Sequence, residues 1–197
     1  MFTWLSMAHL PHPPEIFIQR AQSLTQRNDL PDMVENMHIP ENLRYRTIQR
    51  QGITMPSRVQ RGRDMGADWE QWVRENIITD FYETGFRVNA PVGDSDTHGA
   101  HTDPGRKWKL YYLLERGGDA VTKFYKEKDQ PIIRDQSDKL GTWNNIDELE
   151  VIEQVQWPLY QWVLINTMVI HSVENIQGYR SNFTISIQPQ DLQNLYC

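Results

Sequence analysis

The stretch that decides the fold is residues 180–187, RSNFTISI, close to the end of the 197-residue chain. Its apolar side chains recur at every second position and so share one face of an extended strand; they are Phe183, Ile185 and Ile187. The polar side chains between them share the opposite face; they are Arg180, Asn182, Thr184 and Ser186. A polar face that begins with arginine is typical of a strand that lines a hydrated cavity. We therefore expect one face of this strand to pack and the other to line such a cavity.

Apolar runs of strand length also precede this segment, from Phe81 onward. They are separated by Gly, Pro, Asp and Asn, and they span residues 86–90, 108–114, 121–125, 149–157 and 160–165. Short strands at this spacing, without intervening helices, are typical of an antiparallel sandwich or barrel. The sequence therefore predicts a mainly β fold in which residues 183–187 form the last strand.

The first forty residues are irregular and rich in proline, and two helices are predicted within the N-terminal 80 residues. The first begins at Pro14, and its buried face consists of Phe17, Ala21 and Leu24. The second has Asp64 or Asp68 as its N-cap. Its apolar face, which we expect to pack on a sheet, consists of Trp69, Trp72, Val73 and Ile77. We expect a single domain, residues 1–197, in which residues 1–80 are a supporting segment and residues 81–197 form the β core.

Composition and charge exclude several classes of protein. Aromatic residues make up 11% of the chain, which is typical of a globular protein and not of a disordered one. A net charge of −6 and a pI of about 5.5 argue against binding to nucleic acid or anionic membranes, which requires a field of Lys and Arg. The one cysteine, Cys197, excludes an intrachain disulfide and favours a reducing compartment. Because neither a signal peptide nor an apolar stretch of membrane-spanning length is recognisable, we expect a soluble, cytoplasmic protein.

His101 and Asp103 are the strongest indication of chemistry. In an extended segment, residues two apart point to the same side, so these two side chains can contact one ion. A third ligand must come from another strand, and His171 follows the strand-like run at 162–165. Two imidazoles and one carboxylate suit Fe(II) and leave one face of an octahedral ion open. Zinc could bind the same set tetrahedrally with one water, so the ligands alone leave the metal undecided.

A His-x-Asp pair occurs by chance in many sequences, and His98, three residues before His101, is a competing ligand. We interpret His98 as a loop residue that borders the site. The remaining histidines lie in the proline-rich N-terminal part and are expected to be exposed; they are His9, His12 and His38. The metal-site interpretation gains force from Arg180, nine positions after His171 on the polar face of the last predicted strand.

Four residues carry a resemblance to a known family: His101, Asp103, His171 and Arg180. In their spacing the chain resembles the 2-oxoglutarate- and iron(II)-dependent dioxygenases, in particular the prolyl-4-hydroxylase branch, over about residues 86–187. Two glycine motifs add to the resemblance, Gly117-Gly118 before the run at 121–125 and Gly178-Tyr179-Arg180. The family fold is a double-stranded β-helix, or jelly roll, with N-terminal supporting helices. That fold agrees with the strand pattern above.

The resemblance implies a role for each matched residue. Metal ligation is implied for His101, Asp103 and His171. Arg180 would pair with the distal carboxylate of 2-oxoglutarate. Leu110 and Tyr112, two apart and therefore on one face, would pack against the methylenes of the co-substrate and donate a hydrogen bond to the same carboxylate. Asn182 stands where many relatives carry Ser, Thr or Ala, and its amide can still donate a hydrogen bond there.

The implied cofactors are Fe(II), 2-oxoglutarate and O2, and the implied reaction hydroxylates an aliphatic C–H with release of succinate and CO2. Asp103 favours hydroxylation, because related halogenases lack that ligand. The substrate is either a protein side chain, prolyl by analogy, or a small molecule. Two alternatives stay open. A non-catalytic β-helix interaction domain would usually have lost one of the four residues, and a zinc-dependent cupin-like hydrolase leaves Arg180 and Tyr112 unexplained.

Overall fold

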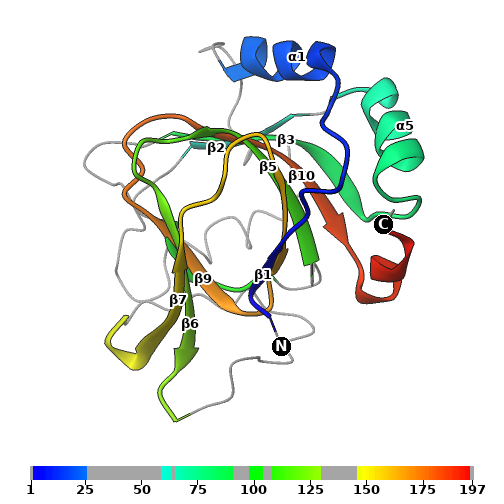
Figure 1. Cartoon of the computed structure of the whole chain (residues 1–197). Helices are drawn as coiled ribbons and strands as arrows, with labels where there is room; N and C mark the ends of the chain where they lie inside the picture. The colour runs from blue at the N-terminus through cyan, green and yellow to red at the C-terminus, as the bar shows by residue number, and fades with distance from the viewer. Residues whose placement is uncertain are drawn as a thin grey trace, which may run out of the picture.

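The structure of the chain, a computed structural model, describes residues 2–25, 59–63, 65–90, 98–103, 108–129 and 146–195 (Figure 1). The helices within these ranges are α1 (Glu15–Thr25), α5 (Ala67–Asn76) and the short 3-10 helices η1 (Ile146–Glu148) and η2 (Pro189–Asn194). The strands are β1 (Trp4–Ser6), β2 (Val59–Arg63), β3 (Glu83–Ala90), β4 (His98–His101), β5 (Trp108–Arg116), β6 (Val121–Glu127), β7 (Leu149–Val155), β8 (Trp162–Asn166), β9 (Ile170–Glu174) and β10 (Arg180–Ile187). The predictions made for Asp64, His38, Cys197 and the side chain of His98 lie outside the described residues.

The strands form two antiparallel sheets that face each other (Figure 1). The larger sheet has the order β1-β8-β5-β10-β3-β2, and the smaller has the order β4-β9-β6-β7. From β3 onward the pairing is nested, so that β3 pairs with β10, β4 with β9, β5 with β8 and β6 with β7. A chain that pairs with itself in this way and winds into two sheets is a double-stranded β-helix, or jelly roll. The predicted fold class is confirmed.

Six strands coincide with the predicted apolar runs; they are β3, β5, β6, β7, β8 and β10. The sequence does not predict β4 and β9 as strands, because HGAH and IHSVE are short and carry few consecutive apolar residues. It also misses β1 and β2. These two strands occupy the two edges of the larger sheet, so the N-terminal 80 residues contribute strands as well as the predicted helices.

Helices α1 and α5 pack on the outer face of the larger sheet (Figure 1). Phe17 of α1 meets Trp69 of α5 edge-on, with ring centroids 5.2 Å apart. Trp69 in turn stacks on Phe183 of β10 at 4.5 Å, and its indole N–H donates a hydrogen bond to the Thr84 hydroxyl of β3 at 2.9 Å. All three rings are buried in one core. The prediction that the apolar faces of both helices pack on a sheet is confirmed.

The start of α5 differs from the prediction. Its N-cap is Gly66, whose φ of 91° lies in the region that favours glycine, and no side-chain hydrogen bond caps the helix. Asp68 lies instead in the first turn, where a carboxylate is favoured by the helix dipole. It accepts two hydrogen bonds, both at 2.8 Å, from the guanidinium of Arg20 in α1. Asp68 therefore joins the two helices and does not cap one.

A second core lies between the two sheets. Its buried apolar residues are Leu113, Phe124, Trp157, Val163, Ile165 and Val169. Strand β10 contributes to both cores, and the residues that face the helices are Phe183, Ile185 and Ile187. Their neighbours Thr184 and Ser186 face the interior between the sheets, where they pair with Tyr111 and Lys109 of β5. The predicted alternation along β10 is confirmed.

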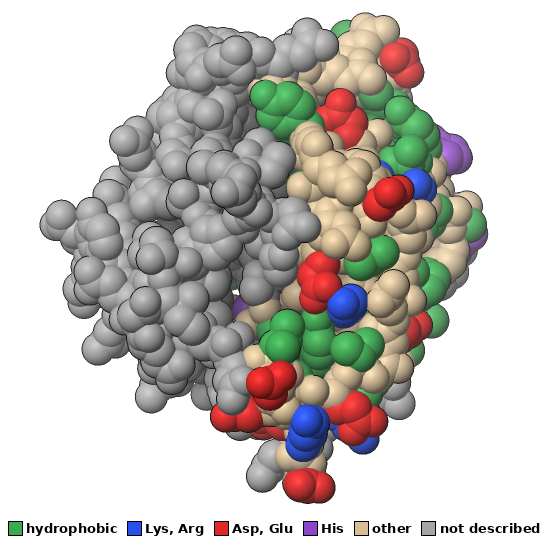
Figure 2. Space-filling view, turned by 90° about the vertical axis from the view of Figure 1, so that its left-hand side faces the viewer, with side chains coloured by type: hydrophobic (Ala, Val, Ile, Leu, Met, Phe, Trp, Pro, Cys, Tyr) green, Lys and Arg blue, Asp and Glu red, His purple; other side chains and the backbone are tan. Residues whose placement is uncertain are grey.

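Charged side chains of both signs are intermixed with apolar ones on the side of the molecule shown in Figure 2. Where β6 and β7 pair, for example, Lys126 forms an ion pair with Glu150 at 2.9 Å. Among the described residues, no helix has both the length and the apolar character that crossing a membrane would require.

Candidate metal centre

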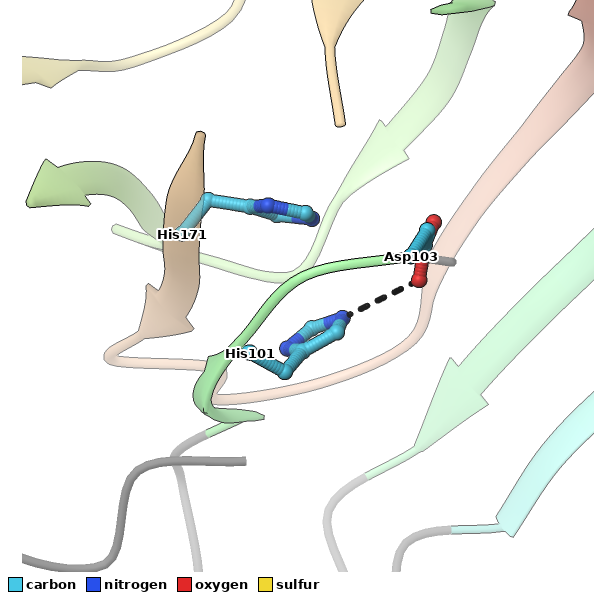
Figure 3. Close-up of side chains that lie close together, drawn as sticks. All are labelled: His101, Asp103 and His171. Carbon is cyan, nitrogen blue, oxygen red and sulfur yellow. Dashed lines mark ion pairs between the residues drawn. The ribbon is translucent and has the colours of Figure 1, made fainter. Parts of the chain in front are cut away.

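His101, Asp103 and His171 lie together at one end of the interior between the sheets (Figure 3). One potential ligand atom from each side chain lies within 4.8 Å of the other two. The pairing of β4 with β9 explains the arrangement, because His101 and His171 are direct partners in the antiparallel register. Paired residues point to the same face of a sheet, and the two imidazole rings are 4.5 Å apart. Asp103 follows two residues later, so its carboxylate reaches the same place.

His171 is held in the form that can bind a metal. Its Nδ1 lies 2.9 Å from the carbonyl oxygen of Val169, which can only accept a hydrogen bond. Nδ1 therefore carries the hydrogen, and the lone pair of Nε2 is left for an ion. Burial, together with the neighbouring His101, lowers the pKa of His171 to about 4. The ring is neutral at physiological pH, as a metal ligand must be.

Asp103 is held as a carboxylate by the charges around it. Burial by itself would raise its pKa, but the ammonium of Lys109 and the two imidazoles hold that pKa well below its usual range. The main-chain N–H of Asp103 donates a hydrogen bond to the carbonyl oxygen of Thr167 at 2.9 Å. This bond ties the segment after β4 to the turn between β8 and β9. The segment that carries Asp103 is therefore anchored to the turn that leads into β9, the strand that carries His171.

Lys109 also belongs to this cluster, and the sequence did not predict it as a site residue. Its side chain is 2% exposed, and its ammonium is bonded to Oδ2 of Asp103. The available signal is its place in the run at 108–114, where a lysine stands among apolar residues. A lysine inside a buried strand indicates that its face of the strand meets a polar interior.

The structure places Leu110 and Tyr112 on the face of β5 opposite to the metal cluster. Both belong to the core beneath the helices, and Tyr112 is the cross-strand partner of Phe183 in β10. The hydroxyl of Tyr112 lies 2.7 Å from Nδ1 of the exposed His12, and burial raises the pKa of Tyr112 to about 12. This placement does not support the co-substrate contacts predicted for Leu110 and Tyr112. A difference of one residue along a strand is enough to put a side chain on the other face.

Tyr111 and Lys109 occupy the inner face of β5 instead. Tyr111 is half-buried beside the inner core, and within the described residues its hydroxyl has no hydrogen-bond partner. It pairs with Thr184, whose Oγ1 is buried and also lacks a partner in the described ranges. Asn182, the next inward residue of β10, is buried and donates a hydrogen bond to the carbonyl oxygen of Phe183 at 3.2 Å.

Arg180 is a buried cation without an acidic partner among the residues that the structure describes. It is 5% exposed, and its guanidinium donates one long hydrogen bond, 3.4 Å, to the carbonyl oxygen of Arg116. Burial lowers the pKa of Arg180 to about 10, an effect that nearby Tyr111 opposes and the side chain of Arg116 reinforces. An unpaired buried charge is costly, so this position is suited to an anion supplied from outside the chain.

A second arginine also faces the interior but differs in its partner. Arg87 of β3 pairs across the strands with Asn182, and its guanidinium forms an ion pair with Glu83 at 2.7 Å. Its charge is therefore already compensated within the chain. Of the two guanidinium groups, that of Arg180 is the one suited to bind an anion.

No protein-family model matches the chain, and no curated protein matches it in sequence. Solved structures with a similar arrangement include a Pseudomonas putida prolyl-4-hydroxylase, at 11% identity and a TM-score of 0.45, with 94% of this chain and 93% of that chain covered. The epimerase SnoN, solved with Fe3+, alpha ketoglutarate and nogalamycin RO, is similar at 8% identity and a TM-score of 0.44, with 94% and 79% covered. Peruvianin-I, a cysteine peptidase from Thevetia peruviana latex, is similar at 16% identity and a TM-score of 0.35, with 70% and 66% covered.

The chain thus spans slightly less than two thirds of Peruvianin-I. These three proteins, a cysteine peptidase, an epimerase and a prolyl-4-hydroxylase, differ widely in activity.

Proposed function

We propose that this protein is an iron(II)- and 2-oxoglutarate-dependent dioxygenase that hydroxylates an aliphatic C–H. One observation carries the proposal. A cluster of two imidazoles and a carboxylate faces the same interior as a buried guanidinium that has no acidic partner among the described residues. The cluster lies on the smaller sheet and Arg180 on the larger one. A dianionic keto acid can bridge a metal ion and a distant cation in such an interior.

The three clustered side chains fit ferrous iron by their chemistry. Imidazole nitrogen and carboxylate oxygen suit Fe(II), and three protein atoms leave about half of an octahedral coordination sphere for small molecules. The hydrogen bond from His171 to Val169 supports this assignment, because metal-binding histidines commonly donate their second ring N–H to a carbonyl oxygen. Zinc fits the same donors, so the buried guanidinium of Arg180, which a zinc-dependent hydrolase leaves unexplained, is what favours iron here.

In this proposal Arg180 and Tyr111 hold the far end of 2-oxoglutarate. The guanidinium presents paired N–H groups to the distal carboxylate, and a charge-assisted bond of this kind contributes about 1.5–3 kcal/mol. The hydroxyl of Tyr111 takes the role first assigned to Tyr112, since it lies on the inner face near Arg180. Asn182, also on that face, has an amide that can turn toward the same ligand.

When bound together with dioxygen, ferrous iron and 2-oxoglutarate would supply the oxidant that hydroxylates the substrate, with one oxygen atom going to the product, the other to succinate, and CO2 released. The protein's own residues orient both groups, and the apolar side chains of the inner core keep bulk water away from them. The substrate is a protein side chain of the prolyl type or a small molecule. Intact His101, Asp103, His171 and Arg180 argue against a non-catalytic interaction domain.

The proposal is tested by adding Fe(II) and 2-oxoglutarate to the protein without oxygen. A chelate of the two at the site should give a weak visible charge-transfer band. His171→Ala should lose the band, whereas the matched control His12→Ala, a histidine outside the cluster, should keep it. No band in the unaltered protein, together with no succinate release in air, would refute the proposal. Tight zinc binding without any keto acid binding would favour the zinc-dependent hydrolase instead.

A further inference from the structure

Lys109 is a buried cation to which the proposed function assigns no role. It lies on the inner face of β5, between its partners Ser186 of β10 and Ile165 of β8. Its ammonium bonds to Oδ2 of Asp103, and no other acid pairs with it in the described part of the chain. Because almost no water reaches this side chain, its position is set by that one carboxylate.

The two oxygens of Asp103 have different surroundings. Oδ2 is bonded to Lys109, whereas Oδ1 points toward the imidazoles and lies 3.6 Å from Nε2 of His101 (Figure 3). The main chain of Asp103 is held by its hydrogen bond to Thr167. Backbone and carboxylate are thus both fixed, and rotation of the carboxylate would break the bond to the ammonium.

The geometry points to Lys109 as a positioning residue that makes Asp103 bind the metal through Oδ1 alone. This inference rests on the proposed function. Carboxylates bind metal ions through one oxygen or through both. Binding through both oxygens would occupy one more position on the ion, at the expense of the open face that a chelating keto acid and dioxygen require. By holding Oδ2, Lys109 keeps that position open.

A plain core ion pair between Lys109 and Asp103 would act on stability alone. A positioning role predicts in addition a change at the metal itself. The number of water molecules on a bound ion separates the two, because it depends on how many oxygens Asp103 contributes and not on how stable the fold is.

The test uses Mn(II) bound to the full-length protein, with exchangeable water counted by the relaxation of solvent protons. We expect about three waters on the ion in the unaltered protein, as for an octahedral ion with three protein ligand atoms, and one fewer in Lys109→Met. The affinity of the Mn(II) form for 2-oxoglutarate should fall by about 10-fold or more in that variant, the usual effect of losing a group that orients a ligand. Lys109→Arg, which keeps the charge and the donors, should restore both values.

The matched control is Lys123→Met, because Lys123 also pairs with a carboxylate, that of Glu174, but on the outer face of the smaller sheet. It should leave the water count and the keto acid affinity unchanged.

If Lys109→Met does not fold, Lys109→Gln is measured in its place. Its amide can still donate a hydrogen bond to Asp103, so we expect the water count of the unaltered protein, and the loss of one water in this variant would overturn the inference. An unchanged water count and affinity in folded Lys109→Met would likewise overturn it. If the unaltered protein binds Mn(II) no better than His171→Ala does, the proposed function itself is wrong.

Discussion

The two faces of strand β5 have opposite chemical character. Its outer residues Leu110 and Tyr112 pack with aromatic rings beneath two helices, whereas its inner residues Lys109 and Tyr111 lie near the carboxylate of Asp103 and the buried guanidinium of Arg180. Alternate side chains of this one strand therefore have different surroundings. The outer face stabilises the fold, whereas the inner face carries polar and charged side chains.

This contrast shows how the protein tolerates a polar interior. The outer core contains Trp69, Phe183 and other large rings in close contact, and burial of such rings contributes most of the free energy of folding. The inner face can then hold Arg180 without an acidic partner among the described residues. If the contrast is right, substitutions on the outer face should change stability alone, and substitutions on the inner face should change ligand binding.

The largest expected effect comes from Phe183→Ala on the outer face of β10. Removing a fully buried ring that stacks on Trp69 should lower the free energy of unfolding by about 3–5 kcal/mol, measured by chemical denaturation. The adjacent inward substitution Thr184→Val removes a hydroxyl without a partner in the described ranges and should be neutral or slightly stabilising. Equal losses from both substitutions would contradict the difference between the faces.

A pH effect should come next, from His171 in the protein freed of metal by a chelator. The pKa of His171 is about 4 in the folded state, below the ordinary value of 6.5 for histidine, because the ring is buried; the unfolded chain therefore binds the proton more readily. The contribution of His171 to the free energy of unfolding should therefore be fully present above about pH 6.5. The free energy of unfolding should fall by about 3 kcal/mol as the pH drops to 4.

His171→Gln should flatten this slope, whereas His12→Ala, which alters an exposed histidine, should retain it. Asp103 disturbs the measurement little, because its pKa is lowered on folding and its own contribution to stability is lost mainly below pH 3.8, the ordinary pKa that it regains in the unfolded chain. A slope that survives His171→Gln would mean that another group is responsible.

A smaller effect is expected from Arg180→Ala, and it should appear in binding. The affinity for 2-oxoglutarate should fall by about 10- to 100-fold, which corresponds to about 1.5–3 kcal/mol for a lost charged hydrogen bond, while metal affinity stays nearly unchanged. Calorimetric titration of each ligand measures the two affinities separately. Arg87→Ala is the comparison; a larger loss there would transfer the carboxylate-binding role to β3.

The smallest effects distinguish the two neighbouring tyrosines. Tyr112→Phe removes the hydrogen bond to His12 and should cost about 1 kcal/mol of stability, with 2-oxoglutarate affinity unchanged. Tyr111→Phe should show the reverse, a weaker keto acid affinity by about 5-fold and an unchanged thermal midpoint. The opposite assignment of effects would restore the role first predicted for Tyr112.

Much of the fold could be predicted because strands and helices leave local patterns. The alternation in residues 180–187 and the Trp face of α5 both depend on neighbours a few positions apart. Strands β4 and β9 could not be predicted from their own residues, since HGAH and IHSVE become strands only by pairing with each other and with β6. The two histidines meet because of that pairing.

The sequence by itself determined the period of the strands that it predicts, the His-x-Asp spacing and the nine-residue offset from His171 to Arg180, because these are relations along the chain. Only the tertiary structure decided which face of β5 looks inward, that Lys109 reaches Asp103, and that Arg180 is buried without an acidic partner among the described residues. The physical reason is that a two-residue period separates side chains into two sets without saying which set is inside. That choice depends on strands and helices far away in sequence.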